Sequence, residues 1–159
     1  MKTTIKELQN RNAYLENQIE AIYLAGTVKQ NRELIHTLDD EIKRNEDEIR
    51  AITNFNVKVG DGITLSYYSD KHAYTIISRT NKTITIQRDK ATLNKNFKPE
   101  IIPGGFAGRC INQNEQTYTY ERDEEGKTLT LRWSNKYGRF VCKEARVSNG
   151  RHEFYDYNF

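Results

Sequence analysis

Histidine and carboxylate side chains are the groups of this chain that could hold a metal ion or move a proton. The three histidines are His36, His72 and His152, and no two of them have the i, i+2 or i, i+4 spacing that places two ligands on one metal. The densest groups are residues 70–72 (Asp-Lys-His) and 152–156 (His-Glu-Phe-Tyr-Asp). Either group could coordinate a divalent cation only if the fold gathered its members. We therefore expect no metal site and no metal-dependent hydrolysis.

Nucleophilic and phosphate-binding motifs are similarly weak. Cys110 has no histidine partner nearby in the sequence, and Gly-x-Ser-x-Gly is absent. Residues 104–109 (Gly-Gly-Phe-Ala-Gly-Arg) look like a phosphate loop but lack the Gly-Lys-Ser/Thr ending. We expect no catalytic residue and no cofactor, and a protein that is not an enzyme.

Two acidic clusters, residues 39–41 and 46–48, are the strongest candidates for protein recognition. They could dock on a basic protein surface through Asp40, Glu41 and Asp47. The alternative is a solvated helix face, with ion pairs to basic residues four positions away. A chain with a formal net charge of +3 is a poor imitation of a DNA duplex.

Residues 94–116 contain both prolines and several glycines, and they resist assignment to regular structure. A connection of this length is often a binding loop, with Phe106 and Arg109 as candidate contacts. The alternative is a loop that folds back and buries Phe97, Ile101 and Phe106 in the core.

Up to Thr53 the chain has a helical period. Two runs follow steps of three and four residues, which place one narrow apolar seam on each helix. The seam positions are Ile5, Leu8, Asn12, Leu15, Ile19 and Ile22, then Val28, Asn31, Ile35, Leu38, Ile42, Asn45, Ile49 and Ile52.

The phase of the period breaks at Gly26, a residue typical of the position just past a helix end. Thr4 with Glu7, and Thr27 with Gln30, have the spacing of capping boxes. The pattern predicts helices at 4–24 and 28–52 that pair as an antiparallel, coiled-coil-like hairpin, which implies a monomer. One long helix that pairs between chains is the alternative.

Three seam positions, Asn12, Asn31 and Asn45, are polar. A buried asparagine lowers coiled-coil stability but defines register or partner number. The alternative is that these positions lie in a frayed or solvent-exposed part of the seam.

From residue 54 onward, alternating residues and turn signals predict six or seven short antiparallel strands. The predicted inward side chains are Ile63, Leu65, Ile76, Ile84, Ile86, Tyr118, Tyr120, Leu129, Leu131, Trp133 and Phe140. The predicted strands lie within 63–67, 73–79, 83–88, 117–122, 128–133, 139–143 and 153–158. We therefore expect an α+β fold with a helical hairpin at 1–53 and an antiparallel β domain at 54–159, including the irregular loop at 94–116.

Charge differs between the two halves. Residues 1–53 hold 8 basic and 10 acidic residues, a net charge of −2, and residues 54–159 hold 17 and 12, a net charge of +5. Because acidic residues are interspersed with the basic ones, we do not expect direct nucleic-acid binding. Two cysteines are too few for a disulfide framework, and no apolar run is long enough to span a membrane. A reducing, cytoplasmic setting is the expectation.

The β half resembles a small uncharacterised module common in phages and mobile elements of Gram-positive bacteria. The resemblance covers about 100 residues. It is carried by VGDGIT at 59–64, SDKHAYTII at 69–77, ITIQRDKA at 84–91, YTYE at 118–121, LRW at 131–133, GRFV at 138–141 and HEFYDYNF at 152–159.

With the helical first half and this length, the layout is also similar to type II-A anti-CRISPR proteins of staphylococcal origin. That resemblance implies a non-enzymatic inhibitor in the bacterial host cytoplasm. Its partner would be a type II CRISPR effector nuclease carrying its guide RNA. Because the chain lacks strong negative charge, we expect docking on the HNH nuclease domain rather than competition with DNA. The alternative is a coiled-coil oligomeric phage protein whose β domain binds nucleic acid.

Overall fold

A computed structural model describes residues 3–104 and 108–158 of the 159-residue chain. Contacts divide the chain into two compact units, Met1–Phe55 and Asn56–Phe159. The helices α1 and α2 belong to the first unit and the strands to the second. This segregation is the α+β class that the change of composition near residue 54 predicts.

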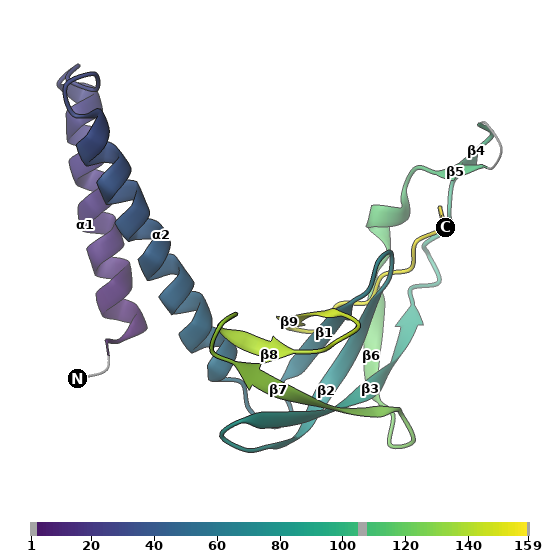
Figure 1. Ribbon diagram of the computed structural model, residues 1–159. Coiled ribbons are helices and arrows are strands. Elements are labelled where there is room, and N and C mark those ends of the chain that lie inside the picture. The colour runs from purple at the N-terminus through teal and green to yellow at the C-terminus, as the bar shows by residue number, and fades with distance from the viewer. Residues whose placement is uncertain (1–2, 105–107, 159) are drawn as a thin grey trace. The chain divides into compact units, whose positions relative to one another are not determined.

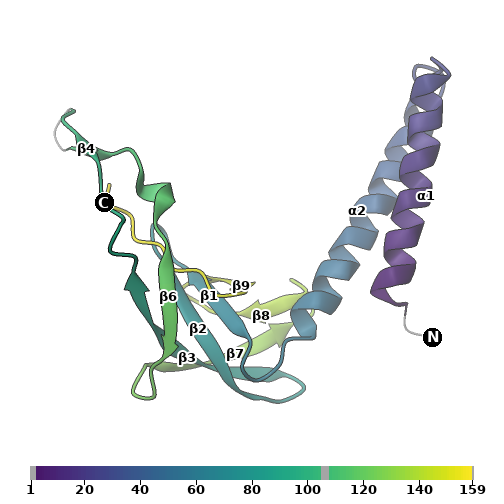
Figure 2. The ribbon, with the colours of Figure 1, turned by 180° about the vertical axis from the view of Figure 1, so that it is seen from behind.

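The first unit consists of α1 (Ile5–Leu24) and α2 (Arg32–Phe55), which lie side by side in Figures 1 and 2. Leu8, Leu15 and Leu38 are buried, and every other predicted seam position is half-buried. Most residues between the seam positions are exposed. The period of three and four therefore identified the face that each helix turns toward its neighbour.

Both ends of α1 are capped as predicted. Thr4 donates its backbone N–H to Glu7 Oε2 at 2.7 Å, and Glu7 donates its N–H to Thr4 Oγ1 at 3.2 Å. At the other end, Gly26 takes a φ of +68° and Thr27 donates to the carbonyl of Ile22. This is a Schellman motif, which requires the left-handed conformation that glycine adopts without strain.

The predicted start of α2 is wrong. The helix begins at Arg32 rather than at residue 28, and Val28, Lys29 and Gln30 lie in a turn. The side chain of Asn31 donates to both the carbonyl and the hydroxyl of Thr27 at 3.0 and 3.1 Å. The break between α1 and α2 also rules out one continuous helix.

The second unit contains a seven-stranded sheet in which hydrogen-bonded neighbours follow the order β8-β7-β3-β2-β1-β9, with β6 also pairing β3. All pairs of this sheet are antiparallel. The strands are β1 (Gly62–Ser66), β2 (Lys71–Arg79), β3 (Thr83–Leu93), β6 (Tyr118–Arg122), β7 (Thr128–Ser134), β8 (Arg139–Val141) and β9 (Arg146–Asn149).

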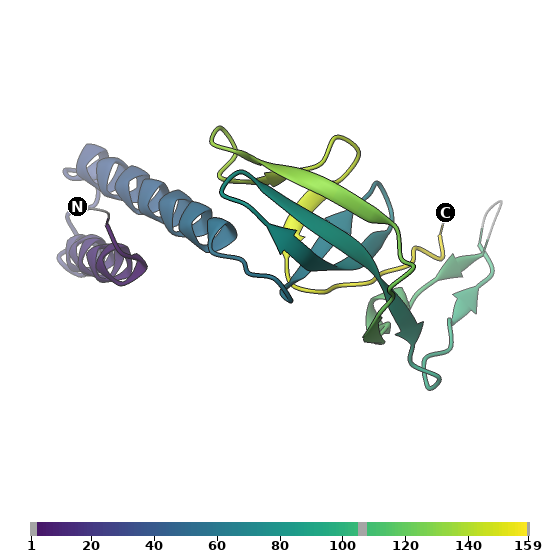
Figure 3. The same cartoon turned by 90° about the horizontal axis from the view of Figure 1, so that it is seen from below.

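The sheet curls into a nearly closed barrel because one long strand serves two partners. The first part of β3 pairs with β7 and its second part pairs with β6, while β2 lies along its other edge. At the two ends of the order, β8 comes close to β9. Figure 3 shows this curvature.

The core of the second unit contains seven of the predicted inward residues as buried side chains. They are Ile63, Leu65, Ile76, Ile84, Ile86, Leu131 and Phe140. The other four predicted residues, Tyr118, Tyr120, Leu129 and Trp133, are half-buried. Val57, Tyr74 and Val147 complete the core and were not predicted.

The predicted last strand at 153–158 is wrong. The last strand is β9, which pairs with β1, and the following segment contributes a single bridge between Lys71 and Phe154. Residues 153–157 are instead held by hydrogen bonds between their backbone and side chains of other segments. They therefore follow the sheet without the regular hydrogen-bond ladder of a strand. Figure 2 shows it near β6.

Residues 94–116 are more regular than predicted. They contain a two-stranded ribbon of β4 (Ile101–Ile102) and β5 (Arg109–Cys110), followed by the short 3-10 helix η1 (Gln113–Glu115). Phe97 is half-buried against the ring of Tyr157, at 5.9 Å between centroids. Ile101 is 61% exposed, so the segment does not bury this residue as the fold-back alternative required.

Within the described residues, neither α1 nor α2 has a stretch apolar enough to cross a lipid bilayer.

Candidate functional site

The side of α2 that is turned away from the seam, here called the outward face, carries two of the predicted contact residues, Asp40 and Asp47. Seven residues separate them, so they lie two helical turns apart on the same side. Their side chains are each 61% exposed. Each carboxylate has one local partner, His36 Nδ1 for Asp40 and Arg50 Nη1 for Asp47, both at 3.1 Å. Such exposed pairs are weak, so both carboxylates remain able to meet a cationic partner.

The third acidic candidate, Glu41, has a different role. Its Oε1 accepts a hydrogen bond from Arg11 Nε at 2.8 Å, which ties α2 to α1. The same bond lowers the pKa of Glu41 and raises that of Arg11. Because Glu41 is already engaged within the helical unit, it is less available to an external partner than Asp40 and Asp47.

The ribbon of β4 and β5 positions the fourth candidate, Arg109, as an exposed residue at the start of β5. The fifth candidate, Phe106, lies outside the described residues. Ile101 and Ile102 in the ribbon, and Ile111 just after it, are 61%, 46% and 53% exposed. Arg109 is therefore accompanied by apolar side chains that the sequence analysis did not single out as contacts.

The second unit contains a charged cluster around Glu153 that was not predicted from the sequence. Glu153, whose side chain is 10% exposed, accepts from Arg88 Nη2 at 2.5 Å and lies 3.1 Å from His72 Nδ1. Its second oxygen accepts the backbone N–H of Ala73 at 2.8 Å. Its own N–H donates to the hydroxyl of Tyr120. The cluster anchors the C-terminal segment to β2, β3 and β6.

A second charged cluster lies close by on the same strands. Asp89 is buried and accepts from the Thr75 hydroxyl at 2.6 Å and from Arg151 Nε at 3.0 Å. Arg151 also donates to the Thr75 hydroxyl at 2.8 Å. Each buried carboxylate is thus paired and hydrogen-bonded, which is how proteins accommodate a charge out of water.

The two residue groups that the sequence suggested for a metal ion are brought together by the fold. His72 contacts Glu153, and Asp70 accepts the N–H of Asp156 at 2.9 Å. However, Arg88 already supplies the positive charge at Glu153. Within the part of the chain that the structure describes, no three His, Cys, Asp or Glu side chains converge on a possible metal position.

Two tyrosines border these clusters, Tyr74, which is buried, and Tyr118, which is half-buried. Burial raises the pKa of Tyr118 to about 12, and nearby Tyr157 and Glu153 act in the same direction. Burial also raises the pKa of Tyr74, although the guanidinium of Arg88 lies 5.7 Å from its ring. Both rings therefore stay neutral at physiological pH, as expected for structural rather than acid–base groups.

Comparison with known proteins gives no relative. No family model, no curated protein and no solved structure matches the chain.

Proposed function

We propose that this protein is an anti-CRISPR inhibitor that binds a type II RNA-guided effector nuclease and blocks cleavage of target DNA. The partner would be the nuclease with its guide RNA, bound through protein–protein contacts in the cytoplasm of a bacterial host. The proposal rests on the resemblance in sequence layout to type II-A anti-CRISPR proteins, together with the character of α2.

The observation that carries the proposal is the exposed acidic face of α2. Asp40 and Asp47 project from a regular helix of 24 residues, so their separation is maintained by backbone hydrogen bonds. A preorganised pair of carboxylates suits a basic protein surface, such as those of nucleases that handle DNA. Arg109 would add a contact from the β unit.

Docking on the HNH domain is the mode that the charge distribution favours. A competitor for DNA needs a strongly negative surface, whereas this chain has a net charge of +3. Cleavage by these effectors requires an HNH docking step after DNA is bound. An inhibitor that binds one HNH arrangement more tightly than the other can block that step without displacing DNA.

An order-of-addition experiment tests this mode. Purified protein is added to a staphylococcal type II effector with guide RNA, either before or after target DNA, while cleavage and DNA binding are followed in parallel. We expect cleavage to be lost in both orders with DNA still bound. Loss of DNA binding, with normal cleavage by the DNA-loaded nuclease, would overturn the HNH mode. No inhibition in either order would overturn the proposed function itself.

We also propose that α1 and α2 form an antiparallel, coiled-coil-like hairpin within one chain in solution. The contact of Arg11 with Glu41 and the half-buried seam support this arrangement. A hairpin would hold α2 straight and present its outward face as one rigid surface.

A phage nucleic-acid-binding protein is the second candidate. The β unit has a net charge of +5, and Tyr137 is 58% exposed with Lys136 and Arg139 at its ring. Cations beside an exposed aromatic ring can hold single strands by phosphate contact and stacking. Strongly salt-dependent binding to single-stranded DNA or RNA would favour this candidate.

A further inference from the structure

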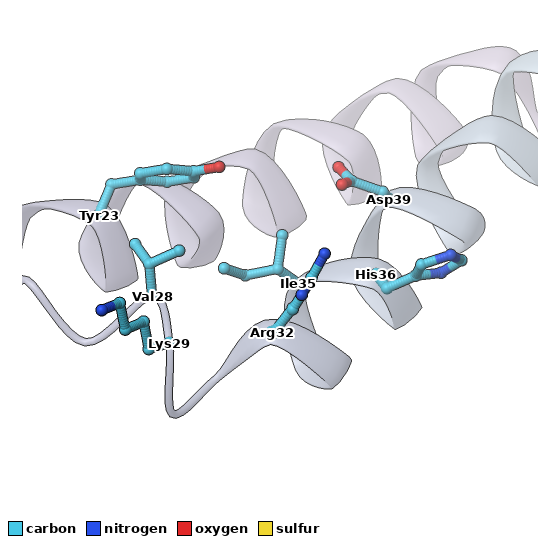
Figure 4. Close-up of a pocket in the computed structure, with 7 residues that line it drawn as sticks. All are labelled: Tyr23, Val28, Lys29, Arg32, Ile35, His36 and Asp39. Atoms are coloured by element: carbon cyan, nitrogen blue, oxygen red, sulfur yellow. The ribbon is translucent and has the colours of Figure 1, made fainter.

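A groove runs along one flank of the two helices toward the turn that connects them. One part of it is lined by Glu16, Ile19, Glu20, Tyr23, Asp39 and Ile42. The adjoining part, drawn in Figure 4, is lined by Tyr23, Val28, Lys29, Arg32, Ile35, His36 and Asp39. Tyr23 and Asp39 line both parts, so the two parts form one continuous surface.

The floor of the groove is apolar and incompletely covered. Ile19, Val28, Ile35 and Ile42 are seam residues, yet each remains half-buried, and Tyr23 is 58% exposed. Figure 4 shows Tyr23, Val28 and Ile35 gathered along one side. Two helices can enclose only a narrow stripe between them, and further helices are needed to cover such side chains fully.

The rim of the groove is divided by charge. Glu16 and Glu20 line only one part, and Asp39 lies where the two parts meet. Among the described residues none of these three carboxylates makes an ion pair. Lys29 and Arg32 line the other part. A second chain can be rotated by 180° about an axis through the middle of the groove and placed against the first. The acidic part of each groove then faces the basic part of the other.

We propose that this groove is the interface of a symmetric dimer, in which two copies of the chain pair their helices as a four-helix bundle. A two-fold interface requires a surface that is complementary to itself, and the divided rim meets this requirement. The apolar floors would cover each other, and the carboxylates of each copy would meet Lys29 and Arg32 of the other.

The inference departs from the monomer that the sequence suggested. That expectation assumed that the two seams would bury each other, whereas 11 of the 14 seam positions are only half-buried. Asp40 and Asp47 do not line the groove, so dimerisation would leave the outward face of α2 exposed. The dimer does not depend on the proposed inhibitory function.

A charge-swap experiment on the full chain tests the proposal. The mass in solution is measured by sedimentation equilibrium from micromolar to hundreds of micromolar protein. We expect the wild type to approach twice 18.7 kDa. The variants Glu16→Lys/Glu20→Lys and Lys29→Glu/Arg32→Glu each place like charges opposite each other in a homodimer. Each should weaken dimerisation at least about tenfold.

An equimolar mixture of the two variants should recover dimers, because in the mixed dimer positions 16 and 20 of each chain again face opposite charge at positions 29 and 32 of the other. A control with the same charge change away from the groove, Glu33→Lys/Glu48→Lys, should dimerise like the wild type. Far-UV circular dichroism checks that each variant is helical. A wild type that stays monomeric throughout would overturn the proposal. So would variants that dimerise normally, or a mixture that fails to recover dimers.

Discussion

Asn45 donates a hydrogen bond from its side-chain amide to the side-chain oxygen of Asn12, at 2.8 Å, and so joins α2 to α1 within the apolar seam. Both residues are half-buried. A polar pair at such a position satisfies its own hydrogen bond only in one register of the two helices. The sequence left open whether these asparagines define the register or lie in an exposed part of the seam. The bond supports a role in defining the register.

Replacing both asparagines with leucine should stabilise the helices. In Asn12→Leu/Asn45→Leu two apolar side chains replace a polar pair, and we expect a gain of about 1 kcal/mol in unfolding free energy. The single change Asn45→Leu should instead destabilise, because Asn12 loses its partner. Thermal unfolding, followed by the helical signal in circular dichroism, measures the stability of both variants. Asn17→Leu on the exposed surface is the control. A double variant less stable than the single one would contradict this account.

The Arg88–Glu153 pair should be important for the stability of the β unit. Glu153→Gln removes the negative charge and leaves the charged side chain of Arg88, which is only 24% exposed. Breaking a buried pair from one side costs about 3 kcal/mol. Urea unfolding followed by Trp133 fluorescence measures the loss, and Glu144→Gln on the surface is the control. A loss similar to that of the control would mean that the pair is not a major anchor of the C-terminal segment.

Alkaline pH should destabilise the β unit through the tyrosines whose pKa is raised by desolvation. The pKa of Tyr118 is raised to about 12, whereas an unfolded tyrosine ionises near pH 10. The stabilisation from this raised pKa is therefore complete below about pH 10 and is lost as the pH rises toward 12. Unfolding measured between pH 8 and 12 should show a smaller alkaline loss in Tyr118→Phe than in the wild type. Tyr68→Phe, which alters a ring that is 92% exposed, should leave the loss unchanged.

Gly126 is required for the close approach of its turn to β3. A methyl group at this position would overlap the carbonyl oxygen of Arg88, and backbone cannot move aside as a flexible side chain can. Gly126→Ala should therefore cost about 1–3 kcal/mol of stability. Gly104→Ala is the matched control, because no described residue outside its chain neighbours lies within 4 Å of the added methyl group. Equal stabilities of the two variants in urea would contradict the predicted overlap.

Reversing the charges of the α2 face should weaken inhibition if the proposed function is correct. Asp40→Lys/Asp47→Lys would repel a basic nuclease surface, and we expect the concentration for half-inhibition of cleavage to rise about tenfold or more. Glu46→Lys/Glu48→Lys changes the charge of the same helix equally at exposed positions to either side of that face and is the comparison. Unchanged inhibition by the first variant would exclude Asp40 and Asp47 as contacts and move attention to the sheet.

Elements whose signals are local could be predicted from the sequence. Thr4 and Glu7 lie three residues apart and form the predicted capping box, and Gly26 ends α1 because it can adopt a positive φ. The steps of three and four identified the seam of each helix, since backbone geometry alone decides which side chains share a face. Alternation in β1, β3 and β7 identified most of the core for the same reason.

Features that depend on residues far apart in the sequence could not be predicted, because they arise when the chain folds. Glu153 and Arg88 are 65 positions apart, and no local pattern indicates that a closing barrel makes them an ion pair. The last strand was misplaced because β9 is defined by its pairing with β1 rather than by its own alternation. The groove between the helices has the same origin. The sequence shows which side chains are apolar, but only packing decides how much of each stays uncovered.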